Sequence, residues 1–463
     1  MISYEEVLFF AILAAGFYMA WSIGANDVAN AIGTSVGSGA LTLKKAVLIA
    51  AVLEFSGALF LGSHVSETVQ RGIINTDIFN DHPLWFVYGM LSSLIGVGIW
   101  LQVATYFGWP VSTTHSIIGA VVGFGAIVGG VEAIYWENVF FIVSSWIISP
   151  LFGGILGFSI FMLLRKQIFY SPHPLKAAKK LMPYLVFVVV TTLALLLLKR
   201  GLNPISISLS LLAGLTAGIV AYFFVGKIAL PEMVPISDRL YAPEIFHALE
   251  RAKKHLLQVQ LKTPHEKVDS ILSDIEEMKE NLTHPEEYEV SSLEFKSIEK
   301  MFGSLQILSA CLMAFAHGTN DVANAIGPLS AAILVLREGT MAASSAVPTW
   351  TLVLGGLGIV VGLATWGWRV IETIGKKLTE LTPTRGFAAE FAAALTVLIA
   401  SRLGMPISTT HTLVGAVIGI GLARGFEAIN LATTRDILLS WIITVPAGAA
   451  LTMAIFWLLK IFY

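Results

Sequence analysis

Two polar motifs each occur twice in this apolar chain, and both consist of residues that can bind ions. The first, Gly-x-Asn-Asp-Val-Ala-Asn-Ala-Ile-Gly, covers 24–33 and returns at 318–327. The second, Pro-x-Ser-Thr-Thr-His, covers 110–115 and returns at 406–411. Duplicated polar motifs inside apolar sequence are typical of a transporter made of two halves with a central binding site.

The Asn-Asp motif carries hard oxygen ligands for a small cation. On a helix, side chains three and four positions apart lie on one face, so each copy forms one polar patch. The flanking glycines are expected to allow local unwinding that frees backbone carbonyls, an arrangement that suits Na⁺. An Asp inside a membrane helix costs ~2.5 to 3.5 kcal/mol on insertion scales, so its duplication favours function over simple helix capping. The predicted Na⁺ ligands are Asn26, Asp27, Asn30, Asn320, Asp321 and Asn324, with Na⁺ at Asp27 and at Asp321.

The Ser-Thr-Thr motif predicts a site for an oxyanion. A proline followed by hydroxyl residues at the head of an apolar, Gly-rich run is a helix-start signal. Free amides, hydroxyls and the ~+0.5 charge of the helix N-terminus then face the same space. One start is usually an ordinary N-cap, but two starts from opposed halves can clamp a tetrahedral anion. The predicted anion-binding residues are Ser112, Thr113, Thr114, Ser408, Thr409 and Thr410.

Charge balance indicates coupled transport. Neither duplicated motif contains Lys or Arg, so Asp27, Asp321 and an incoming anion outweigh two helix ends worth ~+0.5 each. Loading such a site without compensation is strongly unfavourable in a low dielectric, and cations are therefore expected to enter with the substrate. Phosphate fits better than sulfate because hydrogen phosphate carries a proton, which the Asp carboxylates or Thr hydroxyls can accept.

Two further acids lie in apolar runs, Glu54 and Glu390. A buried Glu can stay protonated, or it can pair with a cation or a backbone amide. Proton relay and cation ligand are therefore both open, and both residues are expected to tune coupling. His115, His411 and His317 lie beside the motifs and are expected to be neutral, hydrogen-bonded helix residues rather than proton carriers.

Composition places these motifs in a membrane. Hydrophobic residues make up 56% of the 463 residues, charged residues 13%, and the mean hydropathy is +0.77, which lies outside the range of soluble domains. The fold class expected is an all-α polytopic membrane protein with about 12 transmembrane segments in two inverted repeats, with broken or re-entrant helices. The apolar runs fall near 7–23, 46–63, 84–107, 111–131, 139–164, 182–198, 204–225, 302–317, 348–368, 386–401, 407–424 and 437–459.

A concentration of charged residues divides the chain into three parts. These are a first membrane half over 1–226, comprising repeat 1 and extra helices, a charged helical insert over 227–300, and a second membrane half over 301–463. Lys and Arg favour cytoplasmic loops, so the basic pairs at 44–45 and 165–166 place the N-terminus outside and the insert in the cytoplasm. The second half then starts from the opposite side of the membrane, as an inverted repeat does.

Several other classes of function fit poorly. A net charge of −2 without long basic runs argues against a nucleic-acid partner. Cys311 is the only cysteine, and no Cys/His cluster has metal-site spacing. A membrane phosphatase would need a general base arranged with a nucleophile and would have no use for the duplication, so no enzyme activity is expected. An anion channel with the Ser-Thr-Thr starts as its filter would need no cation and is kept as an alternative.

Together the four motifs resemble those of the inorganic phosphate transporter family often called PiT, which includes sodium-phosphate symporters. The stretch 24–39 looks like the family signature, and the other three motifs match it in the same order. The resemblance covers both membrane halves, while the insert contributes little. It implies twelve membrane segments in inverted repeats, a homodimer and cation-driven uptake of orthophosphate at the cell membrane.

The resemblance also implies functional roles at particular positions, namely Asp27, Asp321, Glu54, Glu390, Ser112 and Ser408. One departure is that Pro328 and Leu329 stand where the first copy has Thr34 and Ser35. The two copies are therefore unlikely to contribute identically. Some bacterial relatives use H⁺ and metal-phosphate complexes, which keeps H⁺ coupling open beside Na⁺ coupling.

The sequence thus predicts a secondary active transporter that imports inorganic phosphate with Na⁺ by alternating access. An H⁺-coupled (metal-)phosphate symporter is the main alternative. The expected partners are phosphate, Na⁺, the lipid bilayer and a second copy of the chain. No cofactor is expected beyond the co-transported Na⁺ or H⁺.

Overall fold

The computed structural model is helical along nearly its whole length. It describes residues 4–197, 204–227, 266–282, 285–338, 346–372, 381–425 and 429–461, with 249, 252–253 and 256–257. The helices are α1 Tyr4–Gly37, α2 Leu43–Arg71, α3 Pro83–Phe107, α4 Thr113–Gly129, α5 Trp136–Leu164, α6 Pro174–Leu197, α7 Pro204–Gly226, α9 Glu266–Leu282, α10 Pro285–Glu338, α11 Thr349–Thr365, α12 Trp368–Glu372, α13 Pro383–Arg402, α14 Thr409–Arg424 and α15 Leu431–Ile461. Short turns at Thr76–Phe79, Val131–Ala133 and Arg165–Phe169 lie between them.

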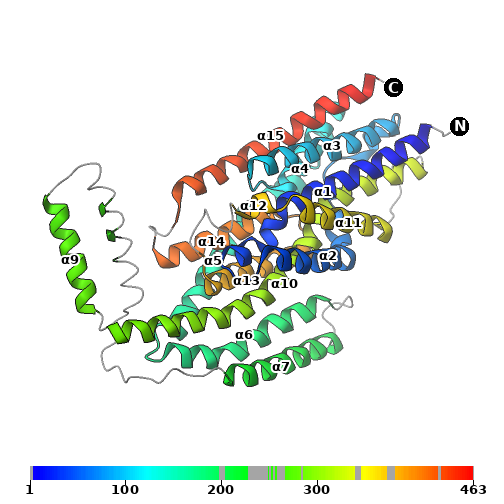
Figure 1. Ribbon diagram of the computed structural model, residues 1–463. Coiled ribbons are helices and arrows are strands. Elements are labelled where there is room, and N and C mark those ends of the chain that lie inside the picture. The colour runs from blue at the N-terminus through cyan, green and yellow to red at the C-terminus, as the bar shows by residue number, and fades with distance from the viewer. Residues whose placement is uncertain are drawn as a thin grey trace.

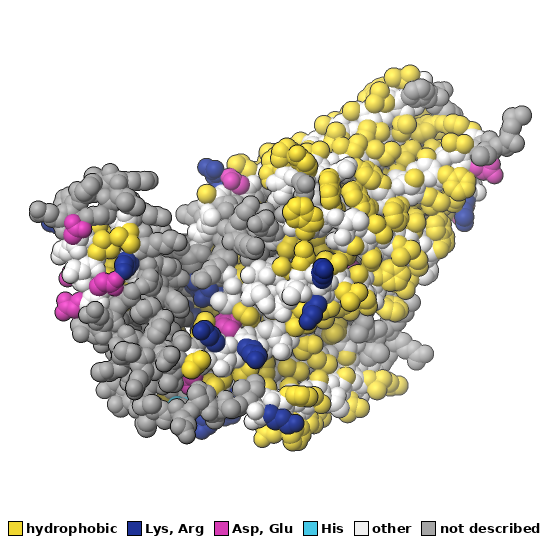
Figure 2. All heavy atoms as spheres, in the orientation of Figure 1, with side chains coloured by type: hydrophobic (Ala, Val, Ile, Leu, Met, Phe, Trp, Pro, Cys, Tyr) yellow, Lys and Arg dark blue, Asp and Glu magenta, His cyan; other side chains and the backbone are white. Residues whose placement is uncertain are grey.

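Each of the twelve apolar runs in the sequence overlaps a helix of the structure. Among the described residues, nine helices are long and apolar enough to cross a membrane, and Thr113–Gly129 and Thr349–Thr365 are shorter apolar helices. Hydrophobic side chains cover much of the visible face of the bundle, and charged side chains gather toward the insert (Figure 2). The predicted class, an all-α polytopic membrane protein, is confirmed.

The helices lie side by side in one bundle (Figure 1). Both ends of the described chain lie at one end of this bundle, and α9 of the insert lies at the other. The most extensive packing joins helices from opposite halves of the chain, since α2 packs on α10, α1 on α11, α4 on α15 and α14 on α5. Helices α6 and α7 pack mainly on each other. The two halves are therefore interleaved.

The Asn-Asp motifs lie on unbroken helices, so the expected local unwinding is wrong. Helix α1 is continuous through its motif, and so is α10. The glycine that opens each motif serves close packing instead. A Cβ at Gly24 would lie 2.0 Å from the backbone oxygen of Ile359 on α11, and one at Gly318 would lie 2.1 Å from that of Glu54 on α2. Only glycine lets the helix backbones approach this closely.

The Ser-Thr-Thr motifs lie at the tips of two helical hairpins. Helices α3 and α4 form one hairpin, and α13 and α14 form the other. The part of each connecting turn that leads into α4 or α14 is buried, because Val111 is 0% exposed and Ile407 is 1% exposed. The sequence predicted an apolar run on each side of these turns, with broken or re-entrant helices among the segments. The structure brings the starts of α4 and α14 into the protein interior, the form that re-entrant segments take.

The predicted boundary between insert and second membrane half, at 300–301, falls inside a helix. Helix α10 runs from Pro285 to Glu338 and contains the second Asn-Asp motif. The insert is helical where it is described, in α9 and the start of α10, and Lys253 pairs with Glu276 of α9. Apart from 227, 249, 252–253 and 256–257, its remaining residues lie outside the described ones. Charged and apolar residues at helical spacing allow one helix to continue from the insert into the bundle.

Close packing at Gly24 gives a test of the bundle. Gly24→Ala is expected to lower the apparent free energy of unfolding in detergent by at least about 1–3 kcal/mol, because the atom that its Cβ meets belongs to the backbone. Gly303→Ala on α10 is the control, since nothing lies within 4 Å of its Cβ. The control is expected to be neutral or stabilising by up to about 1 kcal/mol. Equal thermal stability of the two variants would contradict this packing.

Candidate functional site

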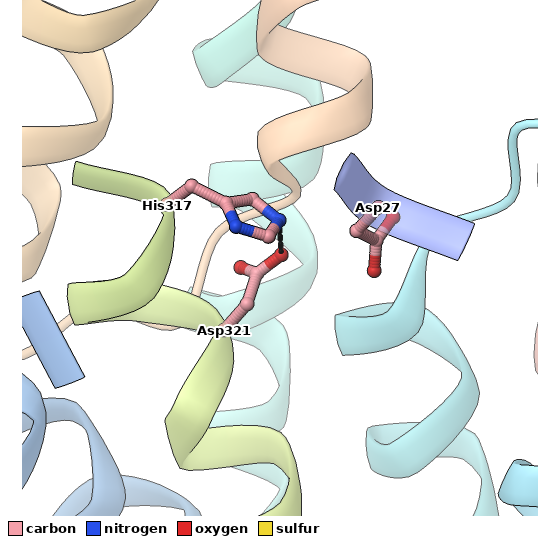
Figure 3. Close-up of side chains that lie close together, drawn as sticks. All are labelled: Asp27, His317 and Asp321. Carbon is pink, nitrogen blue, oxygen red and sulfur yellow. Dashed lines mark ion pairs between the residues drawn. The ribbon is translucent and has the colours of Figure 1, made fainter. Parts of the chain in front are cut away.

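Three ionisable side chains meet at the centre of the bundle. Asp27 comes from α1 and lies across from His317 and Asp321 of α10 (Figure 3). One ligand atom from each lies within 4.8 Å of the other two, and all three residues are buried. The two copies of the Asn-Asp motif, far apart in sequence, therefore supply their carboxylates to a single site.

The two helix starts have the same local structure. Ser112 is the N-cap of α4 and Ser408 is the N-cap of α14. Each serine hydroxyl accepts from the amide of the histidine three residues on, at 3.2 Å for His115 and 3.1 Å for His411. The amides of the two threonines between cap and histidine have no acceptor within their own helix. Each start therefore keeps two amides for a ligand.

Hydrogen bonds cross between the two starts. The Thr114 hydroxyl donates to the backbone oxygen of Ile407 at 2.9 Å, and the Thr410 hydroxyl donates to that of Val111 at 3.1 Å. The extended residues ahead of each helix are thus tied to the first turn of the other. This places all six predicted anion-binding residues around one buried centre, where each is at most 2% exposed.

The carboxylates are linked to the same helix starts. The Thr113 hydroxyl donates to Asp27, and the Thr409 hydroxyl donates to Asp321 at 2.9 Å. The amides of two motif asparagines also donate to the threonines, Asn30 to Thr410 at 2.8 Å and Asn324 to Thr114 at 3.2 Å. The predicted cation and anion ligands therefore form one network.

The first asparagine of each motif anchors a hairpin turn. The Asn26 amide donates to Thr105 at 3.0 Å and to the backbone oxygen of Trp109 at 3.2 Å. The Asn320 amide makes the matching bonds to Ser401 at 3.0 Å and to the backbone oxygen of Met405 at 3.2 Å. These amides therefore position the hairpins. The side-chain carbonyl of Asn26 accepts from the Val111 amide at 3.4 Å, whereas that of Asn320 has no donor among the described residues.

Some buried acceptors lack a donor among the described residues. They are one carboxylate oxygen of Asp321 and the side-chain oxygens of Asn320 and Asn324. A buried acceptor without a partner is destabilising by about 1–3 kcal/mol. Hard oxygen atoms of this kind are ligands that small cations prefer, so the second motif fits a cation.

His317 joins the site through two acids. Its Nε2 lies 3.0 Å from an oxygen of Asp321, and its Nδ1 lies 3.2 Å from an oxygen of Glu54. The corresponding residue before the first motif is Ile23. The sequence interpretation treated His317 as an ordinary helix residue, although a polar residue at only one of two duplicated positions was a signal of asymmetry.

Glu390 lies in a second polar cluster. Its carboxylate is fully buried and accepts from the hydroxyls of Thr34, Ser35 and Ser309, the last two at 2.6 and 2.7 Å. The amide of Gln306 lies 3.4 Å away. Thr34 and Ser35 are the residues that the second motif replaces with Pro and Leu. The departure between the copies, seen in the sequence, is thus what forms this cluster.

No Lys or Arg is among the hydrogen-bond and ion-pair partners of Asp27, Asp321 and Glu390 in the described part of the chain. The centre therefore combines buried negative charge with helix N-termini and hydroxyls. Such a centre can bind an anion and cations together, since each neutralises the other in a low dielectric.

A polytopic helical bundle with interleaved halves and a buried ion-binding centre belongs to the class of membrane transporters. The chain belongs to the phosphate transporter family, whose model matches residues 23–452. The predictions of this family and of a non-enzyme class are confirmed.

The chain is also similar to individual transporters. It is 47% identical to the Arabidopsis thaliana protein "Inorganic phosphate transporter 2-1, chloroplastic", over 98% of this chain and 72% of that one. It is 43% identical to a protein of Chlamydia pneumoniae that is named as a phosphate permease, over 97% of each chain. A solved structure named "The sodium-dependent phosphate transporter" is 36% identical, with a TM-score of 0.80, and the match covers 99% of this chain and 100% of that one.

The bonds that cross between the helix starts can be tested by stability. Thr114→Val and Thr410→Val are each expected to lower the apparent free energy of unfolding by about 1–3 kcal/mol, because each leaves a buried carbonyl without its donor. Thr396→Val is the matched control, since that hydroxyl bonds only within its own helix, to Ala392. Thermal unfolding in detergent without substrate measures all three. If Thr114→Val and Thr410→Val lower the free energy of unfolding no more than Thr396→Val does, these crossing bonds do not stabilise the protein.

Proposed function

We propose that the protein is a secondary active symporter that imports inorganic phosphate together with Na⁺ by alternating access. The observation that carries this proposal is the buried pair of acids, Asp27 and Asp321, bonded to two opposed helix starts. The family of the chain supports phosphate as the substrate. The name of the similar solved structure supports Na⁺ as the coupling ion.

Phosphate would lie between the starts of α4 and α14. Each start offers two backbone amides, two threonine hydroxyls and the positive end of a helix dipole. Four amides facing one space suit a tetrahedral anion with oxygens on all sides. Ser112 and Ser408 would contribute indirectly. Each caps its helix and so fixes the first turn, whose amides would bind the anion. The protonated oxygen of hydrogen phosphate would donate to a carboxylate, a bond that sulfate does not make.

Sodium ions would bind beside the anion at Asp27 and Asp321. Binding there would displace the threonine hydroxyls from the carboxylates and free them for the phosphate. Asn30 and Asn324 would move together with these threonines, because the amide of each already donates to a threonine of the opposing helix start. Cation and anion would then stabilise each other, which is the physical origin of coupling in a centre without Lys or Arg.

Inverted repeats would supply the alternating access. The proposal is supported by contacts that recur with the two halves exchanged. The Gly24 contact with α11 matches the Gly318 contact with α2, and the bonds of Asn26 match those of Asn320. Two halves of the same structure in opposite orientations can exchange conformations, which opens the site to each side in turn.

Glu390 would tune coupling as part of a further cation site. Its cluster supplies carboxylate, hydroxyl and amide oxygens around one buried acid, and these are the ligands that Na⁺ prefers. It lies on α13, close to the cytoplasmic end under the predicted orientation. A cation bound there would neutralise the acid and affect when the centre opens inward.

H⁺ coupling is a second candidate, favoured by one observation. His317 lies between Glu54 and Asp321, at hydrogen-bond distance from both. Three ionisable groups in a row can carry a proton. In this version Glu54 would tune coupling as the outer member of a proton relay, and Asp321 would receive the proton beside the phosphate.

The deciding experiment is uptake of radiolabelled phosphate into sealed proteoliposomes. A Na⁺ gradient and a proton gradient are imposed one at a time, at equal membrane potential. Na⁺ coupling predicts accumulation above equilibrium with the Na⁺ gradient alone. Accumulation with the proton gradient alone would favour the second candidate, and equal rates without any gradient would reject coupling.

Asp27→Asn is expected to abolish phosphate uptake while leaving the protein folded in the membrane. The amide keeps the shape of the side chain but removes the charge that attracts the cation, so uptake should fall by about two orders of magnitude or more, equivalent to ~2.7 kcal/mol. Asp321→Asn is expected to behave alike. Size-exclusion profiles and thermal midpoints check that the variants are folded. Normal transport by either variant would contradict the proposed role of that aspartate in cation binding.

Glu390→Gln is expected to raise the Na⁺ concentration needed for half-maximal uptake by about tenfold, equivalent to ~1.4 kcal/mol. The hydroxyls around the residue keep an acceptor, so the fold should persist. Varying Na⁺ at saturating phosphate gives the measurement. An unchanged Na⁺ dependence would show that Glu390 has no part in cation binding.

The proposed function also includes an oligomeric state and a membrane orientation. The protein would act as a homodimer in the cell membrane, with the N-terminus outside and the insert in the cytoplasm. The position of α9 at the opposite end of the bundle from both termini supports opposite sides of the membrane for the insert and the N-terminus (Figure 1). Labelling of single cysteines introduced in α9 and near Tyr4, in intact cells, tests the orientation, and crosslinking in native membranes tests the dimer.

A further inference from the structure

Four aromatic rings form a column directly behind the two helix starts. The ring of His115 lies on Trp146 of α5, with centroids 3.7 Å apart and planes at 26°. The ring of His411 lies on Trp441 of α15, at 3.4 Å and 21°. The two imidazoles meet at 4.2 Å, nearly perpendicular at 77°. We call this set Trp146, His115, His411 and Trp441 the ring column.

The ring column links the anion-binding helix starts to the outer helices. Each histidine follows directly on the paired threonines of its motif, and its backbone amide is held by the capping serine. Helices α5 and α15 carry the tryptophans, and most of the apolar residues of these two helices are not buried inside the bundle. Each histidine is the third residue of its helix, so any change in the column acts within the first turn of α4 or α14.

Four polar atoms of the ring column lack hydrogen-bond partners among the described residues. These atoms are the indole Nε1 of both tryptophans and the Nε2 of both histidines. The histidines are 4% and 2% exposed. Two indole donors and two imidazole acceptors thus lie in the same buried stack, and face-to-face stacking keeps the donors from pointing at the acceptors. Unpaired buried donors and acceptors are destabilising, whereas phenyl rings could fill this space without that penalty.

We propose that the ring column is a two-state positioning element of the transport cycle. In the state seen here the rings are stacked, and in the other state an indole N–H donates to an imidazole Nε2. The exchange of stacking for hydrogen bonds would turn the histidines and shift the two helix starts that hold the anion. His115, His411, Trp146 and Trp441 are therefore assigned as positioning residues, an inference that rests on the proposed transport function.

The outer helices have a feature that allows such a shift. Pro150 follows Trp146 on α5, and Pro446 follows Trp441 on α15. A proline inside a helix removes one backbone hydrogen bond and makes a bend or hinge there. A Cβ at Gly415 of α14 would lie 2.2 Å from the backbone oxygen of Pro150. Movement at this hinge would therefore act directly on α14.

The test separates positioning from folding and from binding. His115→Phe, His411→Phe, Trp146→Phe and Trp441→Phe each keep a ring in the column. The tryptophan changes remove the indole N–H donor, and the histidine changes remove both imidazole nitrogens, including the unpaired Nε2. Trp100→Phe is the matched control, because Trp100 also has an unpaired indole N–H but lies on α3, outside the column. Three quantities are measured for each variant: the thermal midpoint, the dissociation constant for inorganic phosphate in Na⁺ buffer, and the turnover rate in proteoliposomes.

The column variants are expected to keep the thermal midpoint of the parent protein or exceed it, and to bind phosphate within about threefold of its affinity. Their turnover is expected to fall by about tenfold or more, equivalent to ~1.4 kcal/mol in the barrier. The control should match the parent in all three quantities. Turnover within about twofold of the parent in all four column variants, or a loss of turnover no larger than the loss of affinity, would overturn the proposal.

A second measurement needs no histidine substitution. The indole N–H resonances of Trp146 and Trp441, assigned from the Phe variants, are followed in the parent protein with and without Na⁺ and phosphate. If the column has two states, an indole N–H resonance typical of a hydrogen-bonded indole should appear when Na⁺ and phosphate are bound. Indole resonances that stay typical of a free N–H under all conditions would overturn the proposal. Failure of the parent protein to transport phosphate at all would instead contradict the proposed function.

Discussion

Buried negative charge without a neighbouring Lys or Arg is the constraint on which the centre of this protein depends. Asp27 and Asp321 approach one another in the interior, and threonine hydroxyls, asparagine amides and one histidine are the groups that meet them. Such groups solvate a charge but do not cancel it. Under the proposed function, mobile cations would complete the centre, and this would link the anion to its co-transported ions.

The packing of the helices serves that constraint. Glycines at 24 and 318 allow α11 and α2 to approach the motif-bearing helices to backbone contact. The asparagines next along the motif hold the buried turns of the two hairpins, which brings the helix starts to the carboxylates. Polar backbone at this depth is tolerated because each exposed group has a side-chain partner or faces the binding centre. The same few residues thus pack the bundle and build the site.

The two copies of the Asn-Asp motif differ in the polar residues around them. His317 and Glu54 accompany the second motif, where the first has Ile23, and the Glu390 cluster draws on Thr34 and Ser35 of the first, where the second has Pro328 and Leu329. If the halves act as inverted repeats, as proposed, they would support two related conformations, and unequal polar groups would change the relative free energies of these conformations. The shared backbone and the divergent side chains would then make two separate contributions to transport.

The sequence alone determined the membrane class, the places of the helices and the family, because hydropathy and four ordered motifs are local properties. It also indicated that Asp27, Asp321 and the Ser-Thr-Thr residues belong together, since duplication pairs them. Only the tertiary structure decided that α1 and α10 stay unbroken, that Asn26 and Asn320 anchor hairpins, and that His317 joins Glu54 to Asp321. It likewise brought His115 and His411 together between two tryptophans. Most such contacts join different helices, and which of them form depends on how closely helix backbones can approach, a property of the packed bundle and not of any one segment.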